Sequence, residues 1–202
     1  MGRIVTSDRG ITIPMIVAIG ASAGGVDAIS RLLSGLPPNL AATVLVVLHR
    51  PIERASHLRE ILSLKTSLAV RVAQDGDRLE SGVCLIGTPD RHMAIGPDLR
   101  VINWSNSFYR SHNIDVLFNS LAMYAGERTI GVILSGLLKD GVLGLRAIKQ
   151  AGGTIFVQRP EDAAYPELPG HAIRYAGPVD LVDTAGGLAK AVGRLVGHHS
   201  SA

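Results

Sequence analysis

The stretch MIVAIGASAGG, residues 15–25, combines a short apolar run with a turn made of small residues. Residues 15–19 are apolar, β-branched in part and too few for a buried helix, so they predict a buried strand. The glycine-rich turn leads into a helical pattern over residues 26–36, which Gly35 and the following Pro37 and Pro38 end. A buried strand, a tight turn and a helix in this order are typical of the first unit of a parallel α/β sheet.

The same alternation continues along the rest of the chain. Apolar runs predict further buried strands at residues 43–48, 129–134 and 154–157. Helical patterns cover residues 56–64, 114–125, 142–150 and 186–196. Short runs separated by turn residues predict a small antiparallel insertion, at residues 69–72, 83–86, 93–95 and 99–102. We therefore expect an α/β fold of three layers, doubly wound around a mostly parallel sheet.

Composition indicates one globular domain and argues against several other classes of protein. Of the 202 residues, 47% are hydrophobic and 18% are charged, whereas disordered chains combine low hydrophobicity with high net charge. A formal net charge of +3 without a dense basic tract, and only 4% aromatic residues, argue against a nucleic-acid partner. The single cysteine, Cys84, excludes an internal disulfide and a zinc site of several cysteines. It lies in an apolar run, where we expect an unreactive core thiol.

We expect this domain to cover residues 15–197, with a short leader at residues 1–14 and a flexible tail at residues 198–202. No apolar run is long enough for a secretory signal or a membrane span. These patterns predict a cytoplasmic protein without membrane insertion.

Polar residues follow three of the predicted strands. Ser22 lies in the turn after the first strand, His49 directly follows the second, and Asp140 lies in the glycine-rich loop after the strand at 129–134. In open α/β sheets, ligands bind beyond the carboxyl ends of the strands. Residues 20–24 also match the pattern G-x-S-x-G, in which a sharp turn between strand and helix exposes a nucleophilic serine.

These residue types form a consistent catalytic set. A serine hydroxyl needs a base to accept its proton, which an imidazole can do, and a carboxylate can then orient that imidazole. Each residue also has a structural alternative. Ser22 would cap the following helix, His49 would bond to the backbone, and Asp140 would cap the helix that begins near Val142. The chain order Ser, His, acid differs from the order in α/β-hydrolases.

The other polar clusters carry weaker signals. Histidines at positions 57, 92, 112 and 171 lack the spacing of metal ligands, and we expect them on the surface or in loops. The acidic pairs Asp75 with Asp77 and Glu161 with Asp162 are typical of solvated turns. The arginines at positions 50, 54 and 59 form either a solvated helix face or a rim that attracts an acidic protein substrate.

Several ordered motifs resemble the catalytic domain of the chemotaxis protein-glutamate methylesterases, the CheB family, over residues 16–196. The segments that carry the resemblance are IGASAGG at 19–25, VVLHRP at 46–51, NIDVLFNSLA at 113–122, GVILSGLLKDGVLGL at 131–145, AGGTIFVQ at 151–158 and YPELPGHAI at 165–173. By motif position, the family's nucleophile, base and acid fall on Ser22, His49 and Asp140.

The resemblance implies hydrolysis of glutamate γ-methyl esters on the cytoplasmic signalling helices of methylated chemoreceptors, with release of methanol. Some members also deamidate receptor glutamines. It implies no metal and no organic cofactor. Within this reading, the backbone N–H groups of Ala23 and Leu137 are candidates for the oxyanion hole, and Arg50 and Arg54 are candidates for the substrate rim.

This chain departs from the family pattern at several positions. Ala23 replaces a threonine, Arg50 replaces a methionine, and Leu137 with Leu138 replaces Met-Gly. We expect no receiver domain before the first strand, so the chain is a stand-alone esterase, a fragment or the target of a separate regulatory protein.

Two alternatives remain open. A nucleotide-binding protein would use the glycine turn for phosphate, but the chain lacks G-x-G-x-x-G and a ribose-binding acid. The second alternative is an interaction module that has the same fold and little or no turnover.

Overall fold

The computed structural model describes residues 14–50, 57–105 and 112–199. In chain order the elements are β1 (Met15–Ala21), α1 (Gly25–Ser34), β2 (Ala42–Leu48), α2 (Leu58–Ser63), β3 (Ala69–Val72), β4 (Val83–Ile86), β5 (His92–Ile95), β6 (Val101–Trp104), α3 (Asn113–Tyr124), the 3-10 turn η1 (Gly126–Arg128), β7 (Thr129–Ile133), α4 (Val142–Gln150), β8 (Thr154–Gln158), the 3-10 turn η2 (Pro160–Asp162), α5 (Glu167–Tyr175), β9 (Leu181–Asp183) and α6 (Ala185–His199).

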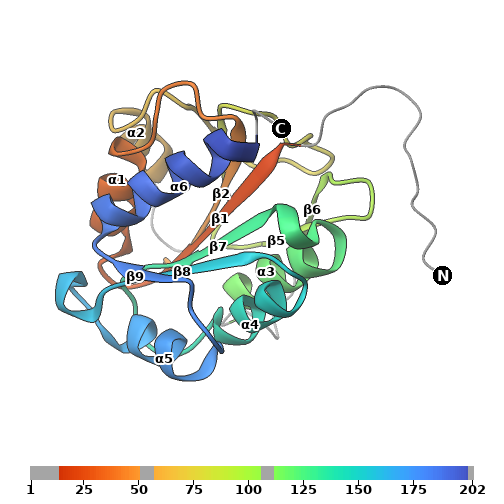
Figure 1. Ribbon diagram of the computed structural model, residues 1–202. Helices are drawn as coiled ribbons and strands as arrows, with labels where there is room; N and C mark the ends of the chain where they lie inside the picture. Colours follow the sequence, from red (N-terminus) through yellow and green to blue (C-terminus); the bar gives the residue numbers. More distant parts are fainter. Residues whose placement is uncertain (1–13, 51–56, 106–111, 200–202) are drawn as a thin grey trace.

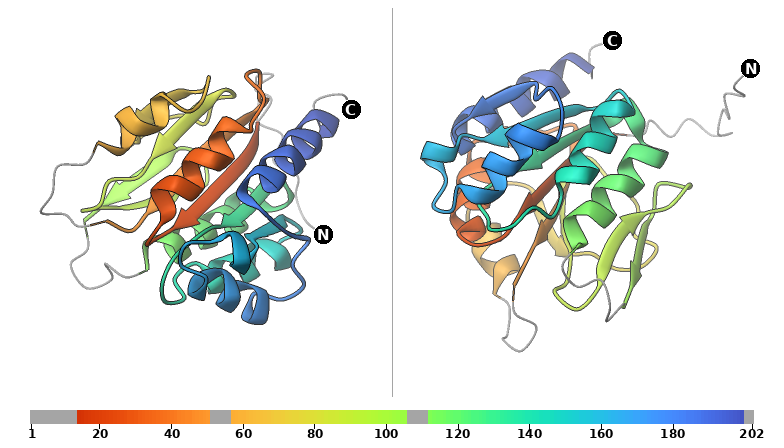
Figure 2. Two further views of the ribbon diagram at one scale, coloured as in Figure 1. Left: turned by 90° about the vertical axis from the view of Figure 1, so that its left-hand side faces the viewer. Right: turned by 90° about the horizontal axis from the view of Figure 1, so that it is seen from below.

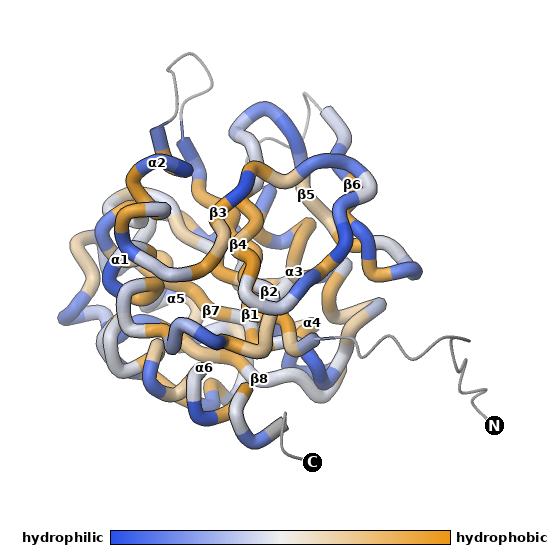
Figure 3. The backbone as a smooth tube through the Cα atoms, turned by 90° about the horizontal axis from the view of Figure 1, so that it is seen from above, coloured by the Kyte–Doolittle hydropathy of each residue, from blue (hydrophilic) through white to orange (hydrophobic). Residues whose placement is uncertain are grey.

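A seven-stranded sheet in the order β3-β4-β2-β1-β7-β8-β9 forms the middle layer. All its neighbouring strands pair in parallel. Every residue of β1, β2, β4 and β7 is buried, as expected for strands covered on both faces. Figure 3 shows these hydrophobic strands in the middle of the molecule.

Helices cover both faces of the sheet. The helices α1, α2 and α6 pack on one face and α3, α4 and α5 on the other (Figures 1 and 2). Each face has its own apolar cluster, with Ile29 and Leu188 in one and Phe118 and Leu145 in the other. The expected three-layer α/β fold is confirmed.

The expected insertion is smaller than the sequence predicts. Only β5 and β6 form a separate antiparallel pair, whereas β3 and β4 are parallel strands of the main sheet. The helix α5 and the short strand β9 were not predicted. Among the described residues, no helix has the length and apolar character that crossing a bilayer requires. The expected leader up to residue 13 and residues 200–202 of the tail lie outside the described residues.

Candidate active site

The register of the three central strands brings distant segments together at one edge of the sheet. Ala21, the last residue of β1, pairs with Leu48 at the end of β2, so Ser22 and His49 emerge side by side. The His49 N–H donates to the Ala21 carbonyl at 3.1 Å. On the other side of β1, the Ser22 N–H donates to the carbonyl of Ser135 at 3.0 Å. Ser22 therefore lies between the segments that follow β2 and β7.

The turn that carries Ser22 depends on glycines at two points. Gly24 has a φ of 71°, in the left-handed region that residues with a Cβ avoid. A Cβ on Gly136 would lie 3.0 Å from the Ser22 Cβ and 2.7 Å from a methyl group of Leu168. The N-cap of α1 is Gly24 and carries no side-chain cap. The alternative that the Ser22 hydroxyl caps α1 is therefore wrong.

The ring of His49 contacts the carboxylate of Asp140. His49 Nε2 lies 2.7 Å from Asp140 Oδ2, and Asp140 is 5% exposed. The ring is not turned for an aligned hydrogen bond along this contact, and such bonds often align only when substrate is present. Because Nε2 faces Asp140, Nδ1 is the ring nitrogen that remains available to accept a proton. The alternative that the His49 side chain bonds only to backbone does not account for this contact.

Asp140 is held by the first turn of α3. Its Oδ2 accepts the Ile114 N–H at 2.9 Å and its Oδ1 accepts the Asp115 N–H at 3.0 Å. The N-terminus of a helix favours a negative charge, so this position stabilises a carboxylate. Gly141 is the N-cap of α4 and has no side-chain cap, so the expectation that Asp140 caps α4 is wrong. It caps α3 instead.

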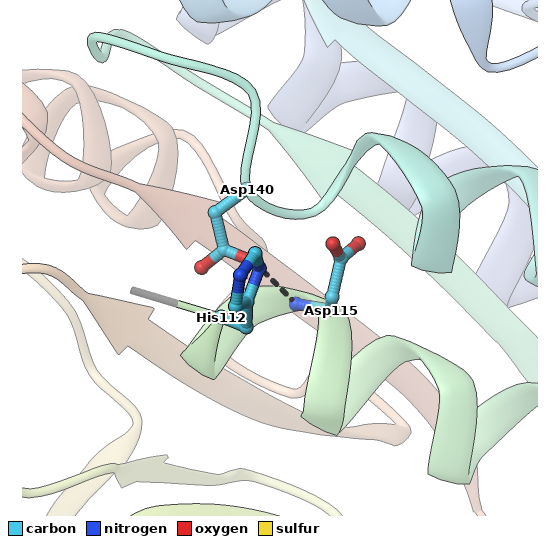
Figure 4. A group of neighbouring side chains, drawn as sticks. All are labelled: His112, Asp115 and Asp140. Atoms are coloured by element: carbon cyan, nitrogen blue, oxygen red, sulfur yellow. Dashed lines mark hydrogen bonds between the residues drawn. The ribbon is translucent and has the colours of Figure 1, made fainter. Parts of the chain in front are cut away.

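Asp115, in the first turn of α3, makes the corresponding contact with α4. Its Oδ1 accepts the N–H of Gly144, in the first turn of α4, at 2.7 Å. Figure 4 shows the Asp140 carboxylate directed at α3 and the Asp115 carboxylate directed at α4. Burial raises the pKa of the Asp115 carboxyl, as does the charge of Asp140, while the bond from Gly144 lowers it without cancelling the rise. We call this arrangement the reciprocal cap of α3 and α4.

His112 stands beside the same two carboxylates, which the sequence spacing did not indicate. One ligand atom from each of His112, Asp115 and Asp140 lies within 4.8 Å of the others (Figure 4). Three of the N–H groups around the cluster already donate to its carboxylate oxygens. We therefore assign these oxygens to the helix caps and to His49.

Two backbone N–H groups beside Ser22 are available for an oxyanion. Within the described part of the chain, neither the Ala23 N–H nor the Leu137 N–H donates to a protein acceptor. The N–H groups of Ser22 and Gly136, which precede them on the chain, are engaged: that of Gly136 donates to the Tyr165 carbonyl at 3.0 Å. Free N–H groups close to a nucleophile are what an oxyanion hole requires.

Ser135 stabilises the turn that carries Ser22, and this role was not predicted from the sequence. Its hydroxyl donates to the Ala23 carbonyl at 2.8 Å and accepts the Tyr165 N–H at 3.0 Å. Its N–H donates to the buried Gln158, which in turn bonds to Asp162. The position of both residues in the sequence could have indicated this role, because Gln158 ends the motif AGGTIFVQ and Ser135 lies in the loop before Asp140.

Asp162 is not a simple solvated turn residue, so that expectation is wrong. It accepts hydrogen bonds from Arg31 at 2.5 Å and from the Ala185 N–H at 3.0 Å. Burial alone would raise the pKa of its carboxyl, but the bonds from Arg31, Ala185 and Gln158 together hold it below its usual range. Asp162 thus links the turn around Ser22 to α1 and α6.

A groove of about 630 Å³ extends from Ser22 and His49 between α1 and α2. Its walls include the apolar residues Val26 and Ile61, and Lys65 lies on its lining. Arg50 also lines it but is half-buried, with one guanidinium nitrogen donating to the Gly87 carbonyl at 2.8 Å. Burial lowers the pKa of that guanidinium.

Two of the three arginines of the expected rim are described, and they have different surroundings. Arg50 is directed inward as described above, Arg59 pairs with its exposed neighbour Glu60, and Arg54 lies outside the described residues. Among the histidines, His57 lines the groove, whereas His92 is buried in β5 and packs against Trp104. The expectation of a surface position for His92 is therefore wrong.

Comparison with known proteins decides the family. A family model described as CheB methylesterase matches residues 17–192. This chain belongs to the CheB methylesterase family. A crystal structure of the CheB methylesterase catalytic domain from Thermotoga maritima has 27% sequence identity and a TM-score of 0.83, and the match covers 92% of this chain and 100% of that one.

Curated relatives of this CheB-family chain carry two activities in their names. A protein-glutamate methylesterase/protein-glutamine glutaminase 2 from Methanosarcina acetivorans is 34% identical over 196 residues, covering 90% of this chain and 53% of the relative. A protein of the same type from Moorella thermoacetica is 35% identical over 188 residues, covering 90% and 44%. The chain thus spans about half the length of these relatives. Family membership supports the esterase reading and not the nucleotide-binding alternative.

Proposed function

We propose that this chain is a serine esterase that hydrolyses glutamate γ-methyl esters on the cytoplasmic signalling helices of chemoreceptors. The contact of 2.7 Å between His49 Nε2 and Asp140 Oδ2, beside Ser22 at the same sheet edge, carries the proposal. Membership of the CheB methylesterase family and the names of the relatives support the reaction type. Residues 15–197 are the catalytic unit in this proposal.

The reaction proceeds in two halves. His49 Nδ1 accepts the Ser22 hydroxyl proton as the oxygen attacks the ester carbonyl, and the Ala23 and Leu137 N–H groups bind the resulting oxyanion. The intermediate collapses, His49 returns the proton to the leaving oxygen, and methanol departs from an acyl-enzyme. Water then attacks the acyl carbonyl, His49 again takes a proton, and a glutamate carboxylate is released while Ser22 is restored.

Deamidation of glutamine uses the same groups with ammonia as the leaving group. The observation in favour is that the relatives' names join methylesterase with protein-glutamine glutaminase. His49 would protonate the departing nitrogen instead of an oxygen, and the second half of the reaction would be unchanged.

The test measures methanol release from a methylated receptor cytoplasmic fragment by the whole chain and by the variant Ser22→Ala. We expect the variant to lose at least about 10³-fold in rate because no other group can form the acyl-enzyme. Ser34→Ala, an exposed serine at the end of α1, is the matched control. A serine-directed phosphonate should label one peptide, the one that contains Ser22.

Each contrary outcome has a distinct meaning. Methanol release by Ser22→Ala at the parental rate would refute the assignment of the nucleophile. Receptor binding without turnover by the parental chain would favour the interaction module. Saturable binding of nicotinamide nucleotides without ester hydrolysis would favour the nucleotide-binding reading.

A further inference from the structure

The loop between Ser135 and Asp140 carries a backbone conformation that leucine resists. Leu138 has a φ of 64°, in the left-handed region where a Cβ meets the following carbonyl oxygen. The family pattern has glycine at this position, and glycine occupies this region without that penalty. Leu138 is 66% exposed, so core packing does not hold it there. Other contacts must hold this backbone in place.

The helix α5 and the residues before it hold this loop on both sides of Leu137. The Tyr165 carbonyl accepts the Gly136 N–H, and the Gly136 carbonyl accepts the Leu168 N–H, both at 3.0 Å. One residue further along, the Leu138 N–H donates to Glu167 Oε1 at 3.1 Å.

His171 completes these contacts one turn further along α5. Its Nδ1 lies 2.8 Å from the Leu138 carbonyl oxygen. A carbonyl oxygen can only accept, so Nδ1 is the protonated nitrogen that donates. Glu167 and His171 are four residues apart and so share one face of the helix. Tyr175, on the next turn, packs against the His171 ring with centroids 6.0 Å apart.

We propose that Glu167 and His171 are positioning residues that hold Leu138 in its left-handed conformation and so aim the free Leu137 N–H at the oxyanion. This inference rests on the proposed esterase function. Both backbone groups of Leu138 are bound by α5, while the Leu137 N–H between these anchors donates to no protein acceptor among the described residues. Without the two side chains, Leu138 relaxes toward negative φ, which turns the peptide plane between Leu137 and Leu138. That turn shifts Leu137, and with it the adjoining Gly136–Leu137 peptide plane that carries the Leu137 N–H.

The first test compares kcat and KM for methanol release by the variants Glu167→Ala and His171→Phe. Phenylalanine keeps a ring against Tyr175 but has no donor. We expect kcat to fall by about 10- to 100-fold, approaching the loss of a whole oxyanion donor, with KM changed by less than about threefold. The conservative variants Glu167→Gln and His171→Asn keep an acceptor and a donor and should recover most of kcat. Glu161→Ala, an exposed acid outside these contacts, is the matched control.

The second test places the same changes in a Leu138→Gly background. Glycine has no Cβ to force the loop out of the left-handed region, so the loss in kcat should shrink to about threefold or less. An equal loss in both backgrounds would overturn the proposal, since α5 would then act by some other route. Values of kcat for Glu167→Ala and His171→Phe that match Glu161→Ala would also overturn it.

A readout independent of turnover separates this inference from the proposed function. Hydrogen exchange of the Leu138 N–H should be at least about tenfold faster in Glu167→Ala than in the parental chain or in Glu161→Ala. Unchanged exchange would overturn the proposal whatever the activity. A parental chain that releases no methanol would refute the esterase function, while faster exchange in Glu167→Ala would still support the hold on Leu138.

Discussion

At the scale of single residues, the Asp140 carboxylate contacts His49 and two N–H groups of α3 at once. In Asp140→Asn one oxygen becomes an NH₂ group that cannot accept from α3, and the charge that stabilises an imidazolium is lost. We expect methanol release to fall by about 10³–10⁴-fold and the free energy of unfolding to fall by about 1–3 kcal/mol. Kinetics and urea unfolding measure the two effects.

Asp98→Asn is the control for this prediction, since Asp98 is exposed and, among the described residues, pairs only with Arg100. It should change neither quantity appreciably. An Asp140→Asn enzyme as fast as the Asp98→Asn enzyme would remove Asp140 from the proposed triad.

Asp115 gives a prediction about stability and pH. Its pKa is raised mainly by burial, so the folded chain binds this proton more tightly than the unfolded chain. The charged form therefore destabilises the fold at neutral pH, and this penalty disappears as the pH falls through the raised pKa toward the ordinary value of about 3.9. Asp115→Asn removes the charge and keeps an oxygen for the Gly144 N–H.

We expect the stability difference between Asp115→Asn and the parental chain to favour the variant most at neutral pH and to decrease in acid. Urea unfolding of both proteins at several pH values gives this difference directly. A difference that is constant with pH would mean that the Asp115 pKa is the same in the folded and unfolded chains.

Sequence reasoning predicted Ser22, His49 and Asp140 as the candidate site because residues at the carboxyl ends of buried parallel strands converge. It could not identify Asp115, Glu167 or His171 in the same way. Their partners are backbone N–H and carbonyl groups on other elements, and a side chain that bonds to remote backbone leaves no spacing pattern. These residues lie in the segments NIDVLFNSLA and YPELPGHAI, which resemble the family pattern, but the sequence of those segments does not show which backbone groups the side chains contact.

At the scale of elements, the close approach of the β7–α4 loop to the nucleophile turn predicts a steric effect. In Gly136→Ala the new methyl group would press on Ser22 and on Leu168. Overpacking of this kind costs about 1–3 kcal/mol, and displacement of Ser22 should abolish most of the esterase activity. Thermal unfolding and methanol release measure the two effects.

Gly170→Ala is the matched control, because a Cβ at this position in α5 meets nothing within 4 Å. It should stabilise the helix by about 0.5–1 kcal/mol and leave activity intact. Equal thermal stability and equal methanol release in the two alanine variants would contradict the tight contact at Gly136.

Two elements show where sequence patterns were insufficient. The segment YPELPGHAIRY contains prolines and a glycine and so did not suggest a helix. In the structure Pro166 is the N-cap and Pro169 lies in the first turn of α5, where backbone N–H groups need no helical acceptor. The runs of β3 and β4 predict strands, but four residues do not specify a partner, and both joined the parallel sheet.

At the scale of the whole molecule, the sheet encloses Cys84 between its two helical layers. Cys84 is fully buried in β4, and burial raises the pKa of its thiol to about 12. We expect no reaction with a water-soluble thiol reagent in the native protein at neutral pH, and one equivalent of reaction in denaturant. Reaction of the native protein at the rate of the denatured protein would mean that the sheet opens readily.

The three-layer architecture was predictable because continuous apolar strands must be covered on both faces. The reciprocal cap of α3 and α4 was not, although it determines where the acid of the site lies. This cap has a consequence for moving the site into another protein. A designer who grafts the segments containing Ser22, His49 and Asp140 onto another parallel sheet would transfer the alcohol and the imidazole with their strands. The carboxylate would arrive without a fixed orientation unless the helix Asn113–Tyr124 were transferred as well.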